Sequence, residues 1–529
     1  MKFSITSKLV LLLSLCQIAV QAQSLLSIDG NLSFPTTDEL QASTQTLRLF
    51  NPNSYPITIS EVDRFEIYGD KVFSVSDSQF TVMPSDTFTL TVSFLPEHNI
   101  LHEQVLVFKS ASGFGHTNVE LSGQGSYSKS YYSVTENKSQ EQLKNTLSSR
   151  LAVGYNDLGY SGARDQMYGS IDNVGGQVEC VYTGRTATFN TRAGANNNSF
   201  NCEHTFPQGF FNSNVPMRSD IHHLFPTDVT ANSRRGNDPF GVVSSSSWTQ
   251  GGSKSGGGKF EPRDAHKGAV ARAMMYFVIR YQDYSNHFSG QESILRQWHE
   301  QYPPNMAEQN RNTAIYNLQN NRNPFVDYPQ FIERISDIDG TASASSLAEL
   351  YASDDTIHLA QGPAMSRFYS FVLYNSGNEN LSITNFNLND PNLSFRNGNP
   401  GTISLDAGES YALEIDFQTD EGYQSQLTYE VSDGIGLQSV PVVSGPGLSL
   451  AAFAEMELPQ FYPNPSRGAV FIANHELIKS LQLIDASGRT WDVEVADQLI
   501  LNELPKGIYS IKVTLKKDEA IYFQKLMLK

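Results

Sequence analysis

Two segments far apart in the chain carry the same succession of short apolar runs and turn residues. The matching pairs are TLRLFNPNSYPITI (46–59) with SFVLYNSGNENLSI (370–383), DTFTLTVSF (86–94) with ESYALEIDF (409–417), and VELSGQG (119–125) with VPVVSGPG (440–447). Alternating apolar residues with Gly, Pro, Asn and Asp between the runs are typical of short antiparallel strands. The sequence therefore predicts two β-sandwich modules, at residues 23–126 and 356–448.

The two modules resemble the immunoglobulin-like modules common in exported bacterial proteins. Neither contains a cluster of His, Cys or paired carboxylates. We therefore expect them to serve in spacing, partner contact or glycan contact.

The first residues have the pattern of a secretory signal peptide. Two lysines precede an apolar run, and small residues follow it up to Ala22. We expect residues 1–22 to be removed, and no later apolar run is long enough to form a transmembrane segment in the mature chain. Removal leaves only Cys180 and Cys202, which in an oxidising compartment can pair or stay reduced.

The formal net charge of −18 argues at first against a polyanionic partner. Residues 127–340, however, carry 20 Lys and Arg against 20 Asp and Glu, so the whole excess of negative charge lies outside them. The acidic flanks favour solubility, and the neutral middle can still present local basic patches.

The middle segment, residues 128–340, has a helical rather than a strand pattern. Residues 267–284 place apolar side chains at helical spacing, and a second helical stretch at 292–302 ends before Pro303 and Pro304. The Gly- and Ser-rich stretch 244–258 lacks a phosphate-loop pattern and predicts a mobile loop. Residues 341–355 predict a linker.

Residues 455–529 resemble the C-terminal sorting domain of the type IX secretion system. The matching features are Pro463-Asn464-Pro465, Gly468, the turn from Leu504 to Tyr509 and a basic end. The resemblance implies a small all-β domain, the type IX secretion machinery as a partner, and a secreted, extracellular or outer-membrane-surface location.

The residues of the middle segment include the groups that phosphodiester hydrolysis needs. Such a reaction uses an activated water and a cation against the negative transition state. Glu203 and His204 are adjacent, and on a strand adjacent side chains point to opposite faces, which favours a strand end packed on a helix. Asn232 can supply an oxygen ligand to a magnesium-type ion. Arg234 and Arg235 follow it, and arginine forks suit phosphate oxygens.

Here the sequence resembles the bacterial endonuclease I proteins, secreted or periplasmic nucleases with a ββα-metal (His-Me finger) site. The matching pieces occur in the family's order: Tyr131-Tyr132, Cys180-Val181-Tyr182-Thr183-Gly184, the run from Asn201 to Gln208, the run from Asp220 to Pro226, Asn232 with Arg235-Gly236-Asn237, Glu261-Pro262, the run from Lys267 to Arg272, and the run from Asn321 to Asp327. The resemblance thus covers nearly all of residues 128–340.

The resemblance implies a role for each matched residue. His204 is the general base, and Glu203 with Asn232 are the protein ligands of Mg²⁺ or of another divalent cation such as Mn²⁺ or Ca²⁺. Family members hold the phosphate with an arginine between the His strand and the metal helix, an interval where this chain has only Arg218. The implied reaction cuts DNA, or alternatively RNA, with little sequence specificity and leaves 5′-phosphate ends.

Other interpretations of these residues stay open at this stage. His222-His223 can suggest zinc, but without Cys or acidic residues at finger spacing a structural role is favoured. Arg235 can bind substrate with Arg234, or pair internally with an acid such as Asp228. The rival function is a secreted binding or adhesion protein with an inactive nuclease-like domain. A different hydrolase has little support, since the chain has neither H-E-x-x-H nor G-x-S-x-G.

Overall fold

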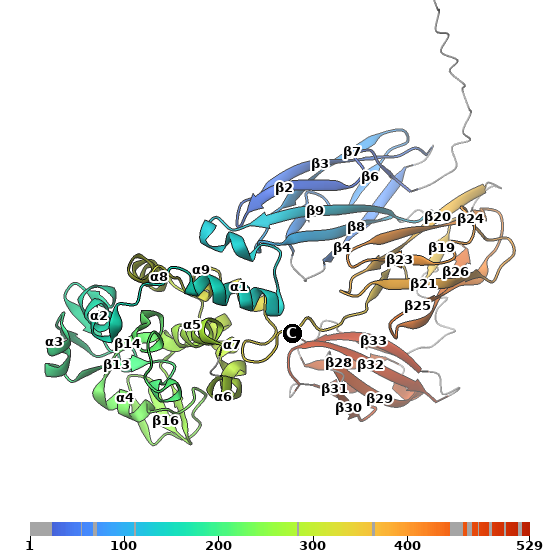
Figure 1. The fold of residues 1–529 in the computed structure, drawn as a ribbon. Helices are drawn as coiled ribbons and strands as arrows, with labels where there is room; N and C mark the ends of the chain where they lie inside the picture. Colours follow the sequence, from blue (N-terminus) through green and yellow to red (C-terminus); the bar gives the residue numbers. More distant parts are fainter. Residues whose placement is uncertain are drawn as a thin grey trace, which may run out of the picture. The chain divides into compact units, whose positions relative to one another are not determined.

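The structure, a computed structural model, contains one compact unit ending at Val442 and a second built chiefly from the residues after it. The ribbon is drawn in Figure 1. The described residues are 24–53, 56–66, 71–110, 113–282, 285–361, 366–444, 459–462, 468–473, 475–485, 489–501, 504–516 and 521–528. The expected signal peptide, residues 1–22, lies outside them. No helix in these ranges is both long and apolar enough to cross a membrane.

The first module is built from two sheets that share one apolar core. One sheet has the order β1-β3-β7-β5, with strands Leu26–Ser27, Ser43–Phe50, Thr87–Phe94 and Phe73–Val75. The other has the order β2-β9-β8-β4-β6, with strands Leu32–Asp38, Thr117–Ser126, Leu101–Ser110, Ile57–Glu66 and Phe80–Val82. Alternate residues such as Leu47 and Leu49 point into the core, as the period of two in the sequence predicts.

The second module repeats this arrangement. Its sheets have the orders β18-β20-β24-β22 (Leu350–Ala352, Ser366–Asn375, Ser410–Gln418, Ser394–Phe395) and β19-β26-β25-β21-β23 (Ile357–Leu359, Gly436–Ser444, Gln424–Val431, Leu381–Leu388, Ile403–Leu405). Strand β18 falls within residues 341–355, which we expected to be a linker. It pairs with β20 from Leu350↔Asn375 onward, so this part of the segment belongs to the sheet.

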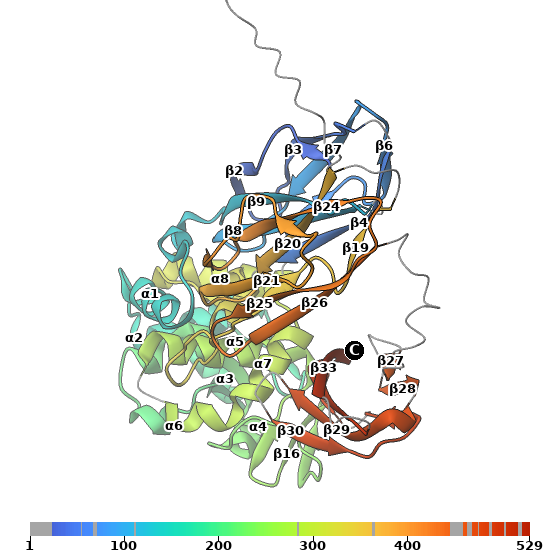
Figure 2. The same ribbon diagram turned by 90° about the vertical axis from the view of Figure 1, so that its right-hand side faces the viewer.

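The C-terminal unit also consists of strands. Its two sheets, red in Figure 2, have the orders β27-β28-β31 (Gln460–Tyr462, Ala469–Ala473, Gln498–Ile500) and β30-β29-β32-β33 (Thr490–Val493, Ile478–Asp485, Gly507–Leu515, Ile521–Leu528). Apolar residues of both sheets, among them Val470 and Ile511, form one core. The motif residues 463–465 lie outside the described residues.

The middle domain is built around helix α5 (Asp264–Tyr281), where we expected a helix. Nearly every residue of α5 is buried, and α1 (Gln140–Ala152) and α7 (Glu292–Gln301) pack against it (Figure 1). The other helices are α2 (Gly159–Gln166), α3 (Arg192–Asn197), α4 (Val229–Arg235), α6 (Ser285–Phe288), α8 (Met306–Gln319) and α9 (Pro324–Asp327). Small sheets flank them, made of β10 (Asn173–Val174), β11 (Gln177–Glu179) and β12 (Thr186–Thr188), and of β13 (Phe200–His204) and β14 (Leu224–Asp228).

The stretch 244–258, expected to be a mobile loop, instead forms part of a sheet. Strands β15 (Trp248–Gln250), β16 (Ser253–Gly256) and β17 (Lys259–Glu261) pair in that order. Gly251 and Gly252 have positive φ angles between β15 and β16. Glycine takes such angles without steric cost. The two glycines therefore form a tight turn between the strands rather than part of a mobile loop.

Candidate active site

The site is organised by two antiparallel strands followed by a short helix. Strand β13 pairs with β14 along its whole length, from Phe200↔Asp228 to His204↔Leu224. Asp228 caps the helix that follows, α4, because its Oδ1 accepts hydrogen bonds from the backbone N–H groups of Thr230 (2.8 Å) and Ala231 (3.3 Å). Helix α4 packs on both strands. The end of β13 thus lies against a helix, as the Glu203-His204 pair suggested.

The two cysteines do not form a disulfide: Cys202 lies in β13, and Cys180 lies against the start of α4. Both are free and buried. Cys180 Sγ accepts a hydrogen bond from the backbone N–H of Asp228 at 3.0 Å, at the start of α4. The thiol therefore helps to fix the junction between β14 and α4.

Glu203 is an enclosed carboxylate with two partners. It is 2% exposed, its Oε1 accepts a hydrogen bond from the Tyr182 hydroxyl at 2.8 Å, and Arg235 Nε lies 3.1 Å from the same oxygen. Burial raises the pKa of Glu203 to about 7, against the opposing effects of the Arg235 charge and the Tyr182 hydrogen bond. Without Arg235 this carboxylate would be harder still to ionise.

Asn232 lies one turn before Arg235 on α4. Side chains three residues apart share one face of a helix, so Asn232 lies on the face from which Arg235 reaches Glu203. Asn232 is half-buried, and its side chain makes no hydrogen bond within the described part of the chain. An amide oxygen and a carboxylate on facing elements are the kind of hard oxygen donors that bind Mg²⁺, which usually keeps several waters as its other ligands. These two residues therefore fit a divalent cation, although no group of three or more His, Cys, Asp or Glu side chains with metal-ligand geometry occurs among the described residues.

His204 faces a different set of groups from Glu203, as neighbours on a strand must. Its Nε2 donates to the backbone carbonyl of Arg218 at 3.3 Å, and its ring centroid lies 5.5 Å from that of Tyr160. Burial lowers the pKa of His204 to about 3, and the nearby His223 adds to this effect. The imidazole is therefore neutral at physiological pH. No hydrogen bond among the described residues links it directly to Glu203 or Asn232.

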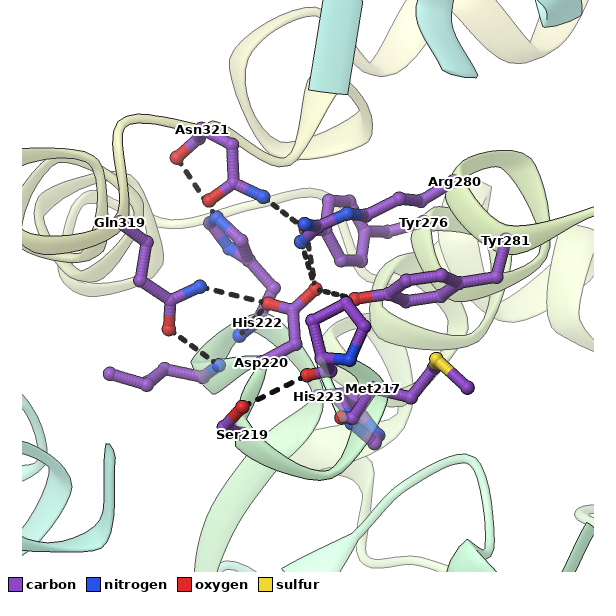
Figure 3. A network of polar contacts seen from close by, with 12 residues as sticks. Met217, Ser219, Asp220, His222, His223, Tyr276, Arg280, Tyr281, Gln319 and Asn321 are labelled. Carbon is purple, nitrogen blue, oxygen red and sulfur yellow. Dashed lines mark hydrogen bonds and ion pairs between the residues drawn. The ribbon is translucent and has the colours of Figure 1, made fainter. Parts of the chain in front are cut away.

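The carbonyl that orients His204 belongs to a segment held by a buried carboxylate, Asp220 (Figure 3). Its Oδ2 accepts hydrogen bonds from the hydroxyls of Tyr276 (2.8 Å) and Tyr281 (2.9 Å) and forms an ion pair with Arg280. Its Oδ1 accepts one from Gln319 Nε2 at 3.1 Å. Burial alone would raise the pKa of Asp220, but the charge of Arg280 and its other partners hold it well below the ordinary value. Asp220 therefore anchors this segment as a charged group.

His222 and His223 have the supporting role that the sequence favoured. His222 Nε2 bonds to the Asn321 carbonyl at 3.1 Å, and His223 Nε2 bonds to the Met217 carbonyl at 2.7 Å. Both histidines are drawn with Asp220 in Figure 3. Both rings are buried. His222 therefore ties the segment of residues 217–223 to the backbone of Asn321, and His223 fixes the shape of the segment itself through Met217.

The three arginines predicted for substrate or phosphate have different placements. Arg234 is exposed, and the Arg218 side chain is half-buried against Tyr160. Arg235 is 1% exposed and donates to the carbonyls of Thr205 (2.7 Å) and Gly236 (2.9 Å) besides pairing with Glu203. This burial corrects the expectation that Arg235 contacts substrate. Its internal partner is Glu203, since Asp228 pairs with Arg185 at 2.8 Å.

Sequence reasoning gave no role to four residues that the structure brings to the site. Tyr182 contacts Glu203, Asp220 anchors the segment next to His204, and Tyr160 packs on the His204 ring. Arg164 lies over Tyr160 on α2. The signal for this last pair was present as Y-x-x-x-R, because residues four apart on a helix are neighbours.

Comparison with known proteins identifies two families in the chain. Residues 135–330 match the family Endonuclease I, and residues 460–529 match the secretion system C-terminal sorting domain. An extracellular ribonuclease of Bacillus subtilis (strain 168) is 32% identical over 225 residues, which cover 39% of this chain and 77% of that protein. The extracellular ribonuclease of Bacillus amyloliquefaciens is 31% identical over 225 residues, covering 39% of this chain and 77% of that protein. An extracellular deoxyribonuclease of Aeromonas hydrophila is 32% identical over 124 residues, covering 21% of this chain and 50% of that protein.

These similarities define the chain as a nuclease that is secreted or displayed at the cell surface. It belongs to the endonuclease I family.

Proposed function

We propose that the protein is a secreted, metal-dependent endonuclease that hydrolyses phosphodiester bonds with little sequence specificity. In this proposal β13, β14 and α4 form a ββα-metal motif, in which Glu203 and Asn232 hold the cation. The observation that carries the proposal is that Asn232 and Arg235 share one face of α4. Because Arg235 contacts Glu203, this face is turned toward Glu203. A buried carboxylate on β13, the strand that ends in His204, then faces a half-buried amide on α4.

The chain's own residues supply the base and orient it. Because Nε2 of His204 donates to the Arg218 carbonyl, its Nδ1 carries the lone pair that can accept a proton from an attacking water. A low pKa keeps this nitrogen unprotonated at neutral pH. The cation, when bound, would neutralise the negative charge that develops on the phosphate oxygens. Arg218 would hold the phosphate, and cleavage would leave 5′-phosphate ends.

In this proposal Arg235 acts on Glu203, whereas the sequence suggested that it binds substrate. Its charge opposes the rise in the pKa of Glu203 that burial causes. A carboxylate must be deprotonated to bind a cation. Arg235 therefore acts as a positioning residue for Glu203, and Arg234 remains the exposed candidate for backbone phosphates.

We propose DNA as the substrate and RNA as a second one. Two of the similar proteins are named extracellular ribonucleases, and a third is named an extracellular deoxyribonuclease. Contacts to phosphate rather than to bases would give little sequence preference and a rate that falls as salt is added.

The remaining segments fit an exported enzyme. We propose immunoglobulin-like folds for the two sandwich modules, removal of residues 1–22 on export, and passage through the type IX secretion machinery by means of residues 455–529. The domain boundaries we propose are 23–126, 128–340, 356–448 and 455–529, with β18 added to the second module.

The test is cleavage of supercoiled plasmid and of a structured RNA by the full mature chain, with Mg²⁺, with a chelator, and with His204→Ala. Loss of a positioned base costs about 10² to 10⁴ in rate. His299→Ala is the matched control, because His299 is also buried and its Nε2 also bonds to a backbone carbonyl, that of Pro329 at 3.0 Å. We expect cleavage only with the cation, loss in His204→Ala, and retained cleavage in His299→Ala. A folded wild type that leaves both substrates intact with Mg²⁺, Mn²⁺ and Ca²⁺ would refute the enzyme and favour a binding protein.

A further inference from the structure

Two guanidinium groups from different elements lie over the ring of Tyr160. The guanidinium carbon of Arg164, on the same helix α2, is 4.1 Å from the ring centroid. That of Arg218, in the 3₁₀ turn Met217–Ser219, is 4.2 Å from it. The Tyr160 ring in turn packs on His204. Two positive charges therefore converge next to the proposed base.

Neither charge is neutralised by a neighbouring acid. The Nε atoms of both arginines are buried without a hydrogen-bond partner, and neither side chain forms an ion pair among the described residues. The acid nearest in sequence to each arginine is engaged elsewhere: Asp165, next to Arg164, pairs with Arg192 at 2.7 Å, and Asp220, two residues after Arg218, pairs with Arg280. The site is thus electropositive, and its two positive charges have no counter-charge among the described residues.

Other stacked arginines of the catalytic domain differ in this respect. Each of them also makes a hydrogen bond or ion pair through its guanidinium group, and they are Arg150, Arg185, Arg235, Arg280, Arg311, Arg322 and Arg334. The other arginines of this domain that stack on an aromatic ring therefore also make a hydrogen bond or ion pair within the protein. Arg164 and Arg218 only stack, which leaves the terminal N–H groups of their guanidinium groups, unlike the buried Nε atoms, for an external anion.

We propose that Arg164 is a second phosphate-binding residue, which acts with Arg218 on the nucleic-acid backbone at His204. This rests on the proposed nuclease function and extends it to a residue outside the β13–α4 motif. Arginine suits the task because its planar fork can bind two phosphate oxygens while its face stays on an aromatic ring. Tyr160 positions both forks, and its contact with His204 sets them beside the reacting bond.

The test separates binding from chemistry. The full chain carrying His204→Ala is titrated with a fluorescently labelled oligodeoxynucleotide at several salt concentrations, with and without Arg164→Met. Loss of a charged hydrogen-bond donor to phosphate should weaken binding about ten- to a hundred-fold. The slope of log Kd against log salt should fall by about 0.7 to 0.9, the value of one phosphate contact. Arg164→Lys should keep the slope and recover only part of the affinity.

Arg150→Met is the matched control, since Arg150 stacks on Tyr131 at 3.6 Å but donates its Nε to the Tyr131 carbonyl. It should lower thermal stability and leave Kd and slope unchanged. If Arg164→Met, in a folded chain, behaves like Arg150→Met, Arg164 is structural and the inference is wrong. That outcome is distinct from failure of the nuclease proposal, which is decided by whether the chain with His204 intact cuts DNA or RNA.

Discussion

Arg235 Nε lies 3.1 Å from Glu203 Oε1, and both side chains are almost wholly enclosed by protein. The pair links the last residue of α4 to the strand that ends in His204. A buried ion pair of this kind gains little net stability over an apolar pair, because desolvation offsets the attraction, but its disruption leaves a buried charge without a partner. The charge of Arg235 thus opposes the rise in the pKa of Glu203 that burial causes, and this effect on ionisation is the clearer consequence of the pair.

Arg235→Met should destabilise the chain and abolish cleavage together. Removal of one partner of a buried pair costs about 3 to 5 kcal/mol. Without the guanidinium, burial should keep Glu203 protonated, and a protonated carboxyl would not hold the proposed cation. The free energy of unfolding in urea and the plasmid-cleavage rate measure the two effects.

The double variant Glu203→Gln with Arg235→Met separates these effects. It removes both charges, so we expect it to regain part of the lost stability while cleavage stays absent. An Arg235→Met variant that retains wild-type cleavage would contradict the positioning role.

Tyr182→Phe removes the hydroxyl that donates to Glu203 at 2.8 Å. We expect kcat/KM to fall about ten-fold, which corresponds to the roughly 1.5 kcal/mol of a hydrogen bond to a charged group. Tyr132→Phe is the matched control, because the Tyr132 hydroxyl donates to Asp327 at 2.7 Å at a buried position elsewhere in the domain. The control should lose stability without losing rate, and equal rate losses in both variants would refute a specific role for Tyr182.

Asp220→Asn should make the chain less stable in a way that depends on pH. The variant leaves Arg280 buried without its counter-charge, so the loss at neutral pH should be about 3 to 5 kcal/mol. The pKa of Asp220 is lowered in the fold from its ordinary value of 3.8. Its contribution is therefore complete above pH 3.8 and is lost as the pH falls below it.

The difference in unfolding free energy between wild type and Asp220→Asn should thus be constant from pH 7 to about pH 5 and shrink below about pH 4. Asp165→Asn is the control, since Asp165 and its partner Arg192 are both more than a third exposed and their pair contributes at most about 1 kcal/mol. Equal losses in the two variants at neutral pH would contradict the anchoring role of Asp220.

The parts of the fold that follow local rules could be predicted from the sequence. The apolar spacing of residues 267–284 indicates a helix, and α5 covers Asp264–Tyr281. The strand ending in the Glu203-His204 pair was expected to pack on a helix, and β13 does so. These features depend on residues close together in the sequence, and the spacing of apolar residues indicates them.

Features that depend on long-range packing could not be predicted. The Glu203–Arg235 pair joins two elements whose relative position only the fold decides, and nothing in the order of residues distinguishes Asp228 from Glu203 as the partner. The hairpin of β15 and β16 was missed because small Gly and Ser residues hide the alternation that marks a strand. Arg164 was missed because its neighbour Arg218 lies in another element, brought close only by Tyr160.

Arg334→Met should show that the first sandwich module and the catalytic domain are one folding unit. Arg334 is buried and donates to Asn99 Oδ1 in that module at 2.7 Å, and to the Thr135 carbonyl at 3.0 Å. Close by, the ring of Tyr127 stacks on that of Tyr328, with centroids 3.8 Å apart. Arg334→Met removes hydrogen bonds from a charged donor and leaves their acceptors unpaired. This change should lower the free energy of unfolding by about 3 kcal/mol.

Urea unfolding followed by both tryptophan fluorescence and far-ultraviolet circular dichroism measures this coupling. With Trp491 of the C-terminal unit replaced by Phe, the fluorescence of Trp248 and Trp298 reports on the catalytic domain, whereas the circular dichroism also reports on the strands of the first module. Arg334→Met should shift the midpoint of both signals to lower urea, because the module and the domain stabilise each other through Arg334. Arg192→Met, which breaks the surface pair with Asp165 and a hydrogen bond to Ser161 Oγ, should leave both midpoints near those of the wild type. An unchanged midpoint in Arg334→Met would mean that the module is a tethered spacer, as its sequence alone suggested.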